Sequence, residues 1–129
     1  MAGETAFDTS VAIRYLNGDP AVVEHVLALP SLILPLPVVA ELLFGAENSA
    51  RRLQNMARYL QFIEVCTVEV MSRETASFYA QARINLKRKG RPIPENDLWI
   101  AAQCLEKQWV LVTDDQHFDY VDGLVLEHW

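Results

Sequence analysis

The sequence has few cysteines and no long apolar run. Of its 129 residues only Cys66 and Cys104 are cysteines, and they form neither a C-x-x-C pair nor a cysteine/histidine zinc spacing. Both lie in apolar surroundings, where a reduced thiol behaves as a small hydrophobe, so we expect neither cysteine to carry a function. The longest apolar stretches, such as SLILPLPVVA, are too short to span a bilayer, and the N-terminus lacks the charged and apolar regions of a secretion signal. We expect a cytoplasmic protein without a membrane segment.

The chain also lacks internal repeats, low-complexity tracts and a linker rich in proline, glycine or serine. Hydrophobic residues make up 51% of it and charged residues 22%, which is the balance of a globular protein rather than a disordered one. A length of 129 residues suits one domain with its own core. We therefore predict a single domain over residues 1–129.

Positive charge is scarce, because the net charge is −6. This excludes a protein that coats nucleic acid by bulk attraction. The basic residues are unevenly placed, however, and five of the eleven lie within nine positions: Arg83, Lys87, Arg88, Lys89 and Arg91. This basic cluster has two interpretations. It is either a solvated helix end that complements the helix dipole, or a surface that holds a phosphate backbone.

Short apolar stretches alternate with helical patterns along the chain. The sequence predicts strands at residues 6–8, 31–36, 64–68, 109–113 and 123–128, and helices at 9–18, 20–29, 37–46, 49–63, 69–89 and 97–107. Such alternation predicts an α/β fold with an open parallel sheet covered by helices on both faces. In these sheets ligands bind beyond the carboxyl ends of the strands.

Acidic residues occur at that edge in separate segments. Asp8 closes the first strand, Asp114 and Asp115 follow the strand at 109–113, and Asp97 opens the last helix. Each of these also has a local explanation as a helix cap or a turn residue. Glu41 is different, since it lies past the helix start among apolar neighbours, where an ionised carboxylate needs a partner.

Carboxylates brought together need a cation. Two of them about 4 Å apart repel by roughly 4 kcal/mol at an effective dielectric constant near 20. No histidine or cysteine has ligand spacing near these acids, and sites made only of oxygen suit Mg²⁺ or Mn²⁺, which also bind phosphate oxygens. The sequence therefore predicts phosphate chemistry.

Five segments together resemble a known family. FDTSVAIRYLNGD, VVAELLFGA, IPENDLWIAA, VLVTDDQHF and the ending GLVLEHW are similar, in order, to the PIN-domain ribonucleases and specifically to the VapC-type toxins of bacterial toxin–antitoxin pairs. The resemblance implies a PIN-like three-layer α/β/α sandwich with a central parallel sheet of four to five strands. The sequence departs from the family in its first strand, because GETAF is shorter and less hydrophobic than the strand that commonly precedes the first aspartate in the family.

The resemblance also implies a site. Its metal-binding and catalytic acids would be Asp8, Glu41, Asp97 and Asp115. The T-x-D-x-x-F spacing in TDDQHF selects Asp115, with Asp114 as the alternative. Thr113, and Thr9 or Ser10 beside the first acid, would support the site by hydrogen bonds.

A function follows from these expectations. We expect a Mg²⁺- or Mn²⁺-dependent endoribonuclease that hydrolyses RNA phosphodiester bonds and acts as the toxin of a type II pair. Its expected partners are an RNA substrate and a cognate antitoxin that presents an arginine or lysine to the carboxylates. Apolar helices at residues 21–29 and 49–63, together with the resemblance, predict a homodimer.

Other functional classes fit less well. A receiver-like signalling domain needs a pair of acids after the first strand and a lysine after a late strand, yet the last lysine is Lys107. A dehalogenase-like phosphatase needs a second aspartate where Ser10 stands. A catalytically silent PIN-fold binding module remains an alternative, although all the expected acids are present.

Overall fold

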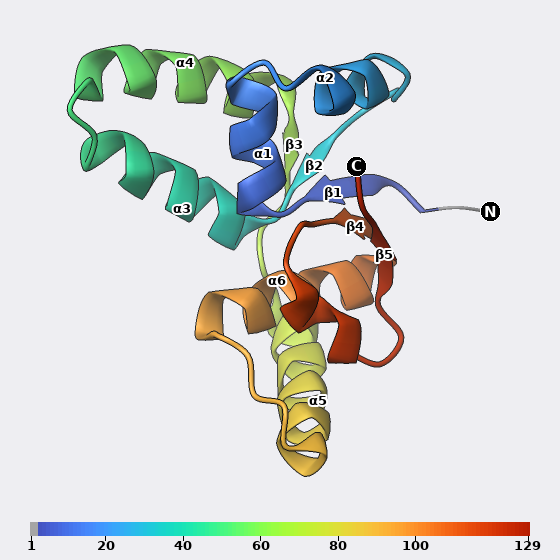
Figure 1. Ribbon diagram of the computed structural model, residues 1–129. Helices are drawn as coiled ribbons and strands as arrows, with labels where there is room; N and C mark the ends of the chain where they lie inside the picture. Colours follow the sequence, from blue (N-terminus) through green and yellow to red (C-terminus); the bar gives the residue numbers. More distant parts are fainter. Residues whose placement is uncertain (1–2) are drawn as a thin grey trace.

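The computed structural model describes residues 3–129, and within them five short strands form one sheet (Figure 1). The strands are β1 (Thr5–Phe7), β2 (Ile33–Leu34), β3 (Thr67–Val68), β4 (Val110–Val112) and β5 (Val125–Glu127). Their order is β3-β2-β1-β4-β5, and every neighbouring pair is parallel. The predicted parallel sheet is confirmed.

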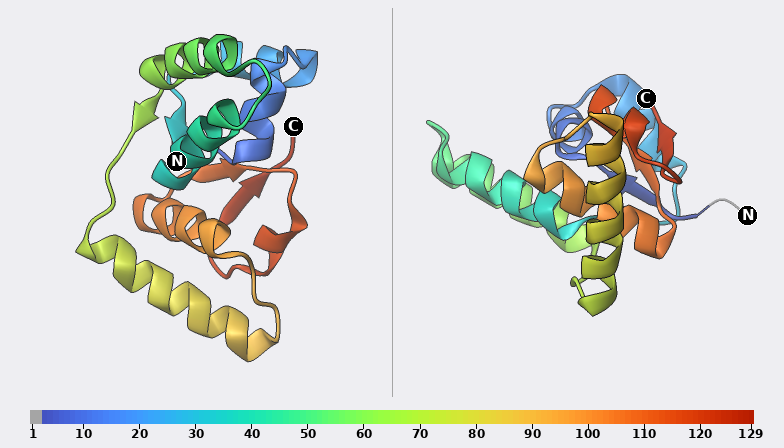
Figure 2. Two further views of the ribbon diagram at one scale, coloured as in Figure 1. Left: turned by 90° about the vertical axis from the view of Figure 1, so that its left-hand side faces the viewer. Right: turned by 90° about the horizontal axis from the view of Figure 1, so that it is seen from below.

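Helices cover both faces of this sheet. They are α1 (Thr9–Leu16), α2 (Pro20–Leu27), α3 (Leu36–Glu47), α4 (Arg52–Val65), α5 (Arg73–Lys89) and α6 (Glu95–Lys107), with a short 3-10 helix, η1 (Gln116–Tyr120), before β5. Figure 2 (left) shows α1 to α4 on one side of the strands and α5 and α6 on the other. The predicted three-layer α/β/α sandwich is therefore confirmed. Among residues 3–129, none of the helices combines the length and the hydropathy that crossing a bilayer requires.

Local signals explain where helices begin and end. The Asp19 carboxylate caps α2 by accepting a hydrogen bond from a main-chain amide of the first turn at 3.0 Å. Gly90 follows α5 in the left-handed conformation, with φ of 68°. The start of α5 was predicted near residue 69, but it lies at Arg73, because the Ser72 amide donates to the Thr75 hydroxyl at 3.0 Å and begins the helix there.

The second strand is shorter than predicted. Within the stretch 31–36, β2 covers Ile33–Leu34, and Leu36 already belongs to α3. The Leu36 amide donates to Oε1 of Gln103 at 2.8 Å, and Nε2 of Gln103 donates to the Glu69 carbonyl at 3.2 Å. The fully buried Gln103 side chain, which comes from α6, thus ends the strand and positions the start of α3.

The strand order places the carboxyl ends of β1 and β4 side by side. Phe7 pairs with Val112, and the Asp8 amide donates to the Val112 carbonyl at 3.0 Å. The strand order reverses at β1, with β2 and β3 on one side of it and β4 and β5 on the other. In parallel sheets ligands bind at the carboxyl ends of the strands next to such a reversal, so we expect a ligand here. Asp8 and the segment 113–115 therefore emerge next to each other.

Candidate metal centre

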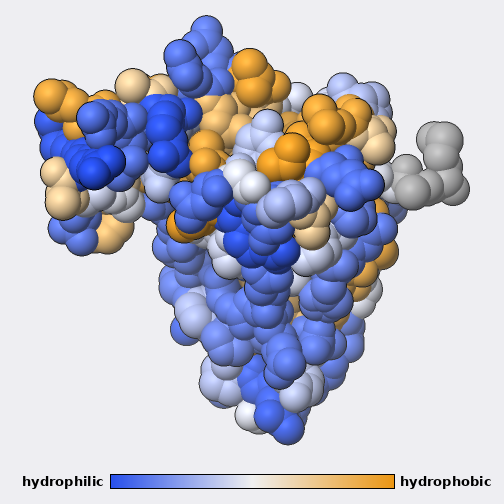
Figure 3. All heavy atoms as spheres, turned by 45° about the horizontal axis from the view of Figure 1, so that its top comes forward, coloured by the Kyte–Doolittle hydropathy of each residue, from blue (hydrophilic) through white to orange (hydrophobic). Residues whose placement is uncertain are grey.

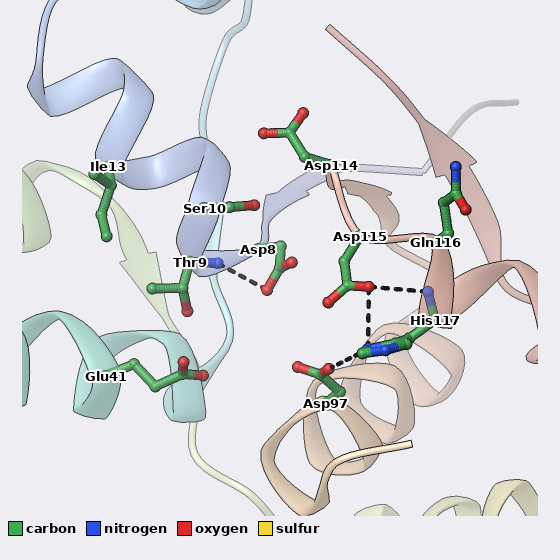
Figure 4. Close-up of a pocket in the computed structure, with 10 residues that line it drawn as sticks. All are labelled: Asp8, Thr9, Ser10, Ile13, Glu41, Asp97, Asp114, Asp115, Gln116 and His117. Carbon is green, nitrogen blue, oxygen red and sulfur yellow. Dashed lines mark hydrogen bonds and ion pairs between the residues drawn. The ribbon is translucent and has the colours of Figure 1, made fainter. Parts of the chain in front are cut away.

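A pocket of about 760 Å³ opens at this edge of the sheet (Figure 4). It is lined by residues from four segments, namely Asp8, Thr9, Ser10, Ile13, Glu41, Asp97, Asp114, Asp115, Gln116 and His117. The structure thus brings every acid singled out in the sequence to one place. Neither lysine nor arginine is among the described residues that line the pocket.

Asp8 is the most buried acid of the pocket, with a relative exposure of 6%. Its Oδ2 accepts a hydrogen bond from the Thr113 hydroxyl at 2.7 Å, and its Oδ1 accepts one from the Thr9 amide at 2.8 Å. Burial raises the pKa of Asp8, the two hydrogen bonds partly counter this, and the charges of Asp115 and Asp114 add to the rise. Asp8 is therefore held in one orientation at a site that disfavours negative charge.

Glu41 has an oxygen without a polar partner. Figure 4 shows its carboxylate directed from α3 toward the other acids. Its Oε1 atom is buried and forms no hydrogen bond within the described residues. Burial raises the pKa of Glu41, and the charges of Asp8 and Asp97 raise it further. The nearby Thr9 hydroxyl lowers this pKa in part, although it forms no hydrogen bond of ordinary geometry with Glu41 within the described residues. An unpartnered buried oxygen costs about 1–3 kcal/mol, which a bound cation would offset.

Asp97 and Asp115 lie on the opposite side of the pocket. Asp97 is in the first turn of α6, and burial raises its pKa, assisted by the Asp8 charge. Asp115 caps η1, where its Oδ1 accepts a hydrogen bond from the His117 amide at 3.0 Å. Together with Asp8 and Glu41, these side chains converge on a common centre (Figure 4).

His117 corrects one expectation. The sequence predicts no histidine with ligand spacing near the acids, yet Nδ1 of His117 lies 3.0 Å from Oδ1 of Asp115 and 3.5 Å from Oδ2 of Asp97. The available signal was the position of His117 two residues after Asp115. It was missed because only the 3-10 turn of η1 folds the ring back onto the carboxylates.

Asp114 differs from its neighbour in direction and in partner. Figure 4 shows its carboxylate turned away from the centre on which the others converge. Nη1 of Arg14 lies 2.8 Å from Oδ1 of Asp114, and Nε of the same arginine lies 2.8 Å from Oδ2 of Asp19. One guanidinium thus pairs with both carboxylates, so Arg14 is not free to hold a substrate.

Comparison with known proteins places this arrangement in a family. The sequence matches the PIN domain over residues 6–124. The chain belongs to the PIN-domain family. This PIN domain is 30% identical over 131 residues to ribonuclease VapC1 of Haemophilus influenzae (strain R2866), with 95% of each chain covered. The VapC-type resemblance is therefore confirmed.

Solved structures agree with this assignment. The PIN domain is similar to a chain in the crystal structure of VapBC2 from Rickettsia felis bound to a promoter DNA fragment. The TM-score is 0.91 and the identity 25%, and the match covers 97% of this chain and 98% of that chain. VapBC-5 from Mycobacterium tuberculosis, described as a member of the VapBC family of toxin–antitoxin systems, has a TM-score of 0.74, 27% identity and coverage of 98% and 97%.

The donor set of this PIN domain fits a divalent metal ion. The pocket offers carboxylate oxygens, which Mg²⁺ and Mn²⁺ prefer. Among the residues that the structure describes, one buried oxygen of Glu41 has no hydrogen-bond partner, and neither lysine nor arginine lines the pocket. Each of these features is unfavourable alone and favourable with a cation present.

Thr113 connects two of the acids in this PIN domain. Its fully buried hydroxyl donates to Asp8 and accepts a hydrogen bond from the Asp115 amide at 2.9 Å. Thr113→Val keeps the shape and removes both bonds, so we expect the free energy of unfolding to fall by about 1–3 kcal/mol. Urea denaturation measures this. Thr113→Ser, which keeps the hydroxyl, should lose less, and equal losses in the two variants would contradict the role of the hydroxyl.

The basic cluster of this PIN domain is divided among several partners. Nη1 of Arg83 lies 3.9 Å from Oε2 of Glu95 at the start of α6, and Nζ of Lys89 pairs with Asp122. The Arg91 guanidinium stacks on a tyrosine ring. Figure 1 shows the C-terminal end of α5 at the lower tip of the molecule, from which residues 90–94 lead back to α6. The cluster therefore does not directly border the acidic pocket.

Proposed function

We propose that this PIN domain is a metal-dependent endoribonuclease and the toxin of a type II toxin–antitoxin pair. In this proposal Mg²⁺ or Mn²⁺ is held by carboxylates from four segments: Asp8, Glu41, Asp97 and Asp115. The observation that carries it is their convergence on one pocket whose described lining has no lysine or arginine. The names of the similar proteins, a ribonuclease and a toxin–antitoxin system, support the same function.

Each acid has a distinct part in the proposed reaction. Asp8 is oriented by Thr113 and by the first amide of α1, so it needs no reorganisation to act as a ligand. Glu41 offers an oxygen that breaks no existing hydrogen bond when it binds a cation. A bound divalent ion supplies a water of lowered pKa and polarises the scissile phosphate. Asp97 and Asp115 complete the negative charge that retains the ion.

The proposed ligands are tested by neutral substitutions of equal size. We expect Asp97→Asn to lower Mg²⁺-dependent cleavage of a mixed RNA pool by at least about 100-fold, because the amide loses the charge that holds the cation. Asp115→Asn should have a similar effect. Asp114→Asn should lower cleavage less than about tenfold, since Asp114 is already paired with Arg14.

The same assay includes its controls. Chelation with EDTA should abolish cleavage by the wild type, and Mg²⁺ or Mn²⁺ should restore it. If Asp114→Asn abolished cleavage while Asp115→Asn retained it, Asp114 would be the fourth ligand. If wild-type protein bound RNA without cutting it in either metal, the silent binding module would be correct.

The receiver-like alternative is wrong, because the strand order of the sheet is β3-β2-β1-β4-β5, whereas receiver domains have the order 2-1-3-4-5.

RNA needs a positive surface to approach an acidic protein. We propose that Lys87 and Arg88 contact its phosphates, because both are exposed at the end of α5 and, within the described residues, neither forms an ion pair. Such contacts position the backbone and carry no sequence preference. A cytoplasmic location suits an RNA substrate and remains a prediction.

An antitoxin is the proposed protein partner. The carboxylates of the metal-free pocket repel one another, so a guanidinium or ammonium group presented by the antitoxin would be attracted to them. The similar structures from Rickettsia felis and Mycobacterium tuberculosis are both VapBC proteins, which supports such a partner. Arg14 already pairs with Asp114 in this way at the edge of the pocket.

A second copy of the chain is the other proposed partner. Figure 3 shows apolar side chains interspersed with hydrophilic ones over the upper part of the molecule. Its exposed large apolar side chains include Leu27, Leu53, Leu60 and Val65. Leu53 and Leu60 are seven residues apart and therefore share one face of α4.

We expect light scattering at micromolar concentration to give about twice the monomer mass of 14.6 kDa. Leu53→Gln combined with Leu60→Gln should raise the dissociation constant at least about tenfold, because burying each leucine contributes about 1.5–3 kcal/mol. Gln54→Ala, a change one position along the helix, is the control. A monomeric wild type would contradict the dimer.

We also propose that residues 1–129 form one domain. Met1 and Ala2 lie outside the described residues, but a single buried core of the others draws on the sheet and on both helical layers.

A further inference from the structure

His117 places a nitrogen atom among the carboxylates of the pocket. Its Nδ1 atom lies 3.0 Å from Asp115 Oδ1 and 3.5 Å from Asp97 Oδ2, and Figure 4 shows the ring between these two acids. One ligand atom from each of the three residues lies within 4.8 Å of the other two. The histidine thus lines the pocket together with these acids.

These separations are those of atoms that share a metal ion. Two ligands at right angles on a metal with bonds of about 2.1 Å lie roughly 3 Å apart. The side chain of His117 is half exposed, with a relative accessibility of 51%. In the neutral ring Nε2 can therefore carry the proton, which leaves the lone pair of Nδ1 available to bind a metal ion.

We infer that His117 is a ligand of the metal ion and makes the site prefer Mn²⁺ to Mg²⁺. The inference rests on the proposed function, because it assumes a divalent ion among the four carboxylates. Imidazole is a ligand of transition metals, whereas Mg²⁺ is held almost entirely by oxygen. Mn²⁺ shares the preference for oxygen but, as a transition metal, binds imidazole more readily than Mg²⁺ does. The alternative role for His117 is a hydrogen bond to Asp97 and Asp115 without contact to the ion.

Pulsed electron paramagnetic resonance of Mn²⁺ bound to the wild-type protein distinguishes the two roles. A directly bound imidazole gives a nitrogen coupling that a carboxylate or water ligand does not give. We expect this coupling in the wild type and in His25→Gln, and its loss in His117→Gln. His25 is a matched control because it lies on α2, where its ring stacks on Trp129, and it is not among the residues lining the pocket.

Metal affinity provides a second readout that needs no RNA. By calorimetry, His117→Gln should weaken Mn²⁺ binding at least about tenfold and Mg²⁺ binding less than about threefold. Equal losses for the two metals, or a wild-type Mn²⁺ spectrum without nitrogen coupling, would overturn the role of His117 and leave the carboxylate site standing. Failure of the wild type to bind either metal would overturn the inference together with the metal site.

Discussion

Glu41→Gln is expected to lower Mg²⁺-dependent RNA cleavage by at least about 100-fold while the protein stays folded. The substitution preserves the size of the side chain and its helical position but removes the charge that faces Asp8 and Asp97. The Oε1 atom of Glu41 is buried and has no hydrogen-bond partner in residues 3–129, so no hydrogen bond seen in that part of the chain is broken when the carboxylate is replaced. Cleavage of one RNA, measured per folded molecule, tests the loss of activity.

Stability separates a metal ligand from a structural residue. Glu41 is repelled by the charges of Asp8 and Asp97, so Glu41→Gln should leave the melting temperature of the metal-free protein unchanged or slightly higher. Glu47→Gln is the matched control, since Glu47 lies on the same helix, is exposed and, among residues 3–129, pairs only with Arg52 at 2.7 Å. Full activity of Glu41→Gln with a lowered melting temperature would mean that Glu41 is structural.

Divalent metal ions are expected to raise the melting temperature strongly. An ion at 100 times its dissociation constant adds about 2.7 kcal/mol to the free energy of unfolding when it binds only the folded state. For a domain of this size the corresponding shift is roughly 10 °C. Differential scanning calorimetry with and without Mg²⁺ or Mn²⁺ measures it, and the shift should be largely absent in Asp97→Asn. An equal shift in that variant would place the ion elsewhere.

The stability of the metal-free protein should depend on pH through the same acids. Burial raises the pKa values of Asp8, Glu41 and Asp97, so in the folded state they keep protons that the unfolded chain releases from about pH 4 upward. Where the folded state binds more protons, the free energy of unfolding falls as the pH rises. These acids therefore stabilise the fold at low pH, and the contribution is lost as the pH passes through their raised pKa values.

Other acids act in the opposite direction, so the test is a comparison. The pKa values of Asp19, Glu47 and Glu74 are lowered, chiefly by hydrogen bonds, and their contribution grows with pH. Subtracting the pH profile of Glu41→Gln from that of the wild type gives the contribution of Glu41 together with its charge coupling to Asp8 and Asp97. Without metal, we expect the free energy of unfolding of the wild type to fall relative to that of Glu41→Gln as the pH rises. With metal, we expect it to rise relative to that of the variant. A flat difference in both conditions would contradict the raised pKa.

The arrangement of elements was predictable because it depends on local patterns. Alternating apolar stretches and helical periodicity located all the strands, and capping residues such as Asp19 and Gly90 marked helix ends. Two boundaries were predicted wrongly: the start of α5, although its Ser72–Thr75 contact is local, and the end of the second strand, which a distant side chain sets. The strand at 31–36 was shortened because Gln103, nearly 70 residues away in sequence, accepts a hydrogen bond from the amide of Leu36.

The choice between Asp114 and Asp115 shows the same limit within the site. Both follow β4, and the residue pattern alone left both open as metal ligands until the family spacing was considered. The structure gives them different surroundings, because Arg14 pairs with Asp114, whereas the Asp115 amide donates to the Thr113 hydroxyl and the Asp115 carboxylate caps η1. That Asp115 is the metal ligand stays a prediction. Arg14 is 100 positions from Asp114, so no local pattern contains this contact.

By itself the sequence determined which segments carry acids and that these segments end at one edge of a parallel sheet. It also marked Glu41 as unusual, since a charge past the start of an apolar helix needs a partner wherever it lies. Only the tertiary structure decided which atoms face one another: the unpartnered oxygen of Glu41, the outward turn of Asp114 and the ring of His117 between Asp97 and Asp115. The physical reason is that the repeat of a helix or strand decides which face of that element a residue lies on. The direction of its side chain depends on partners that come from remote parts of the chain.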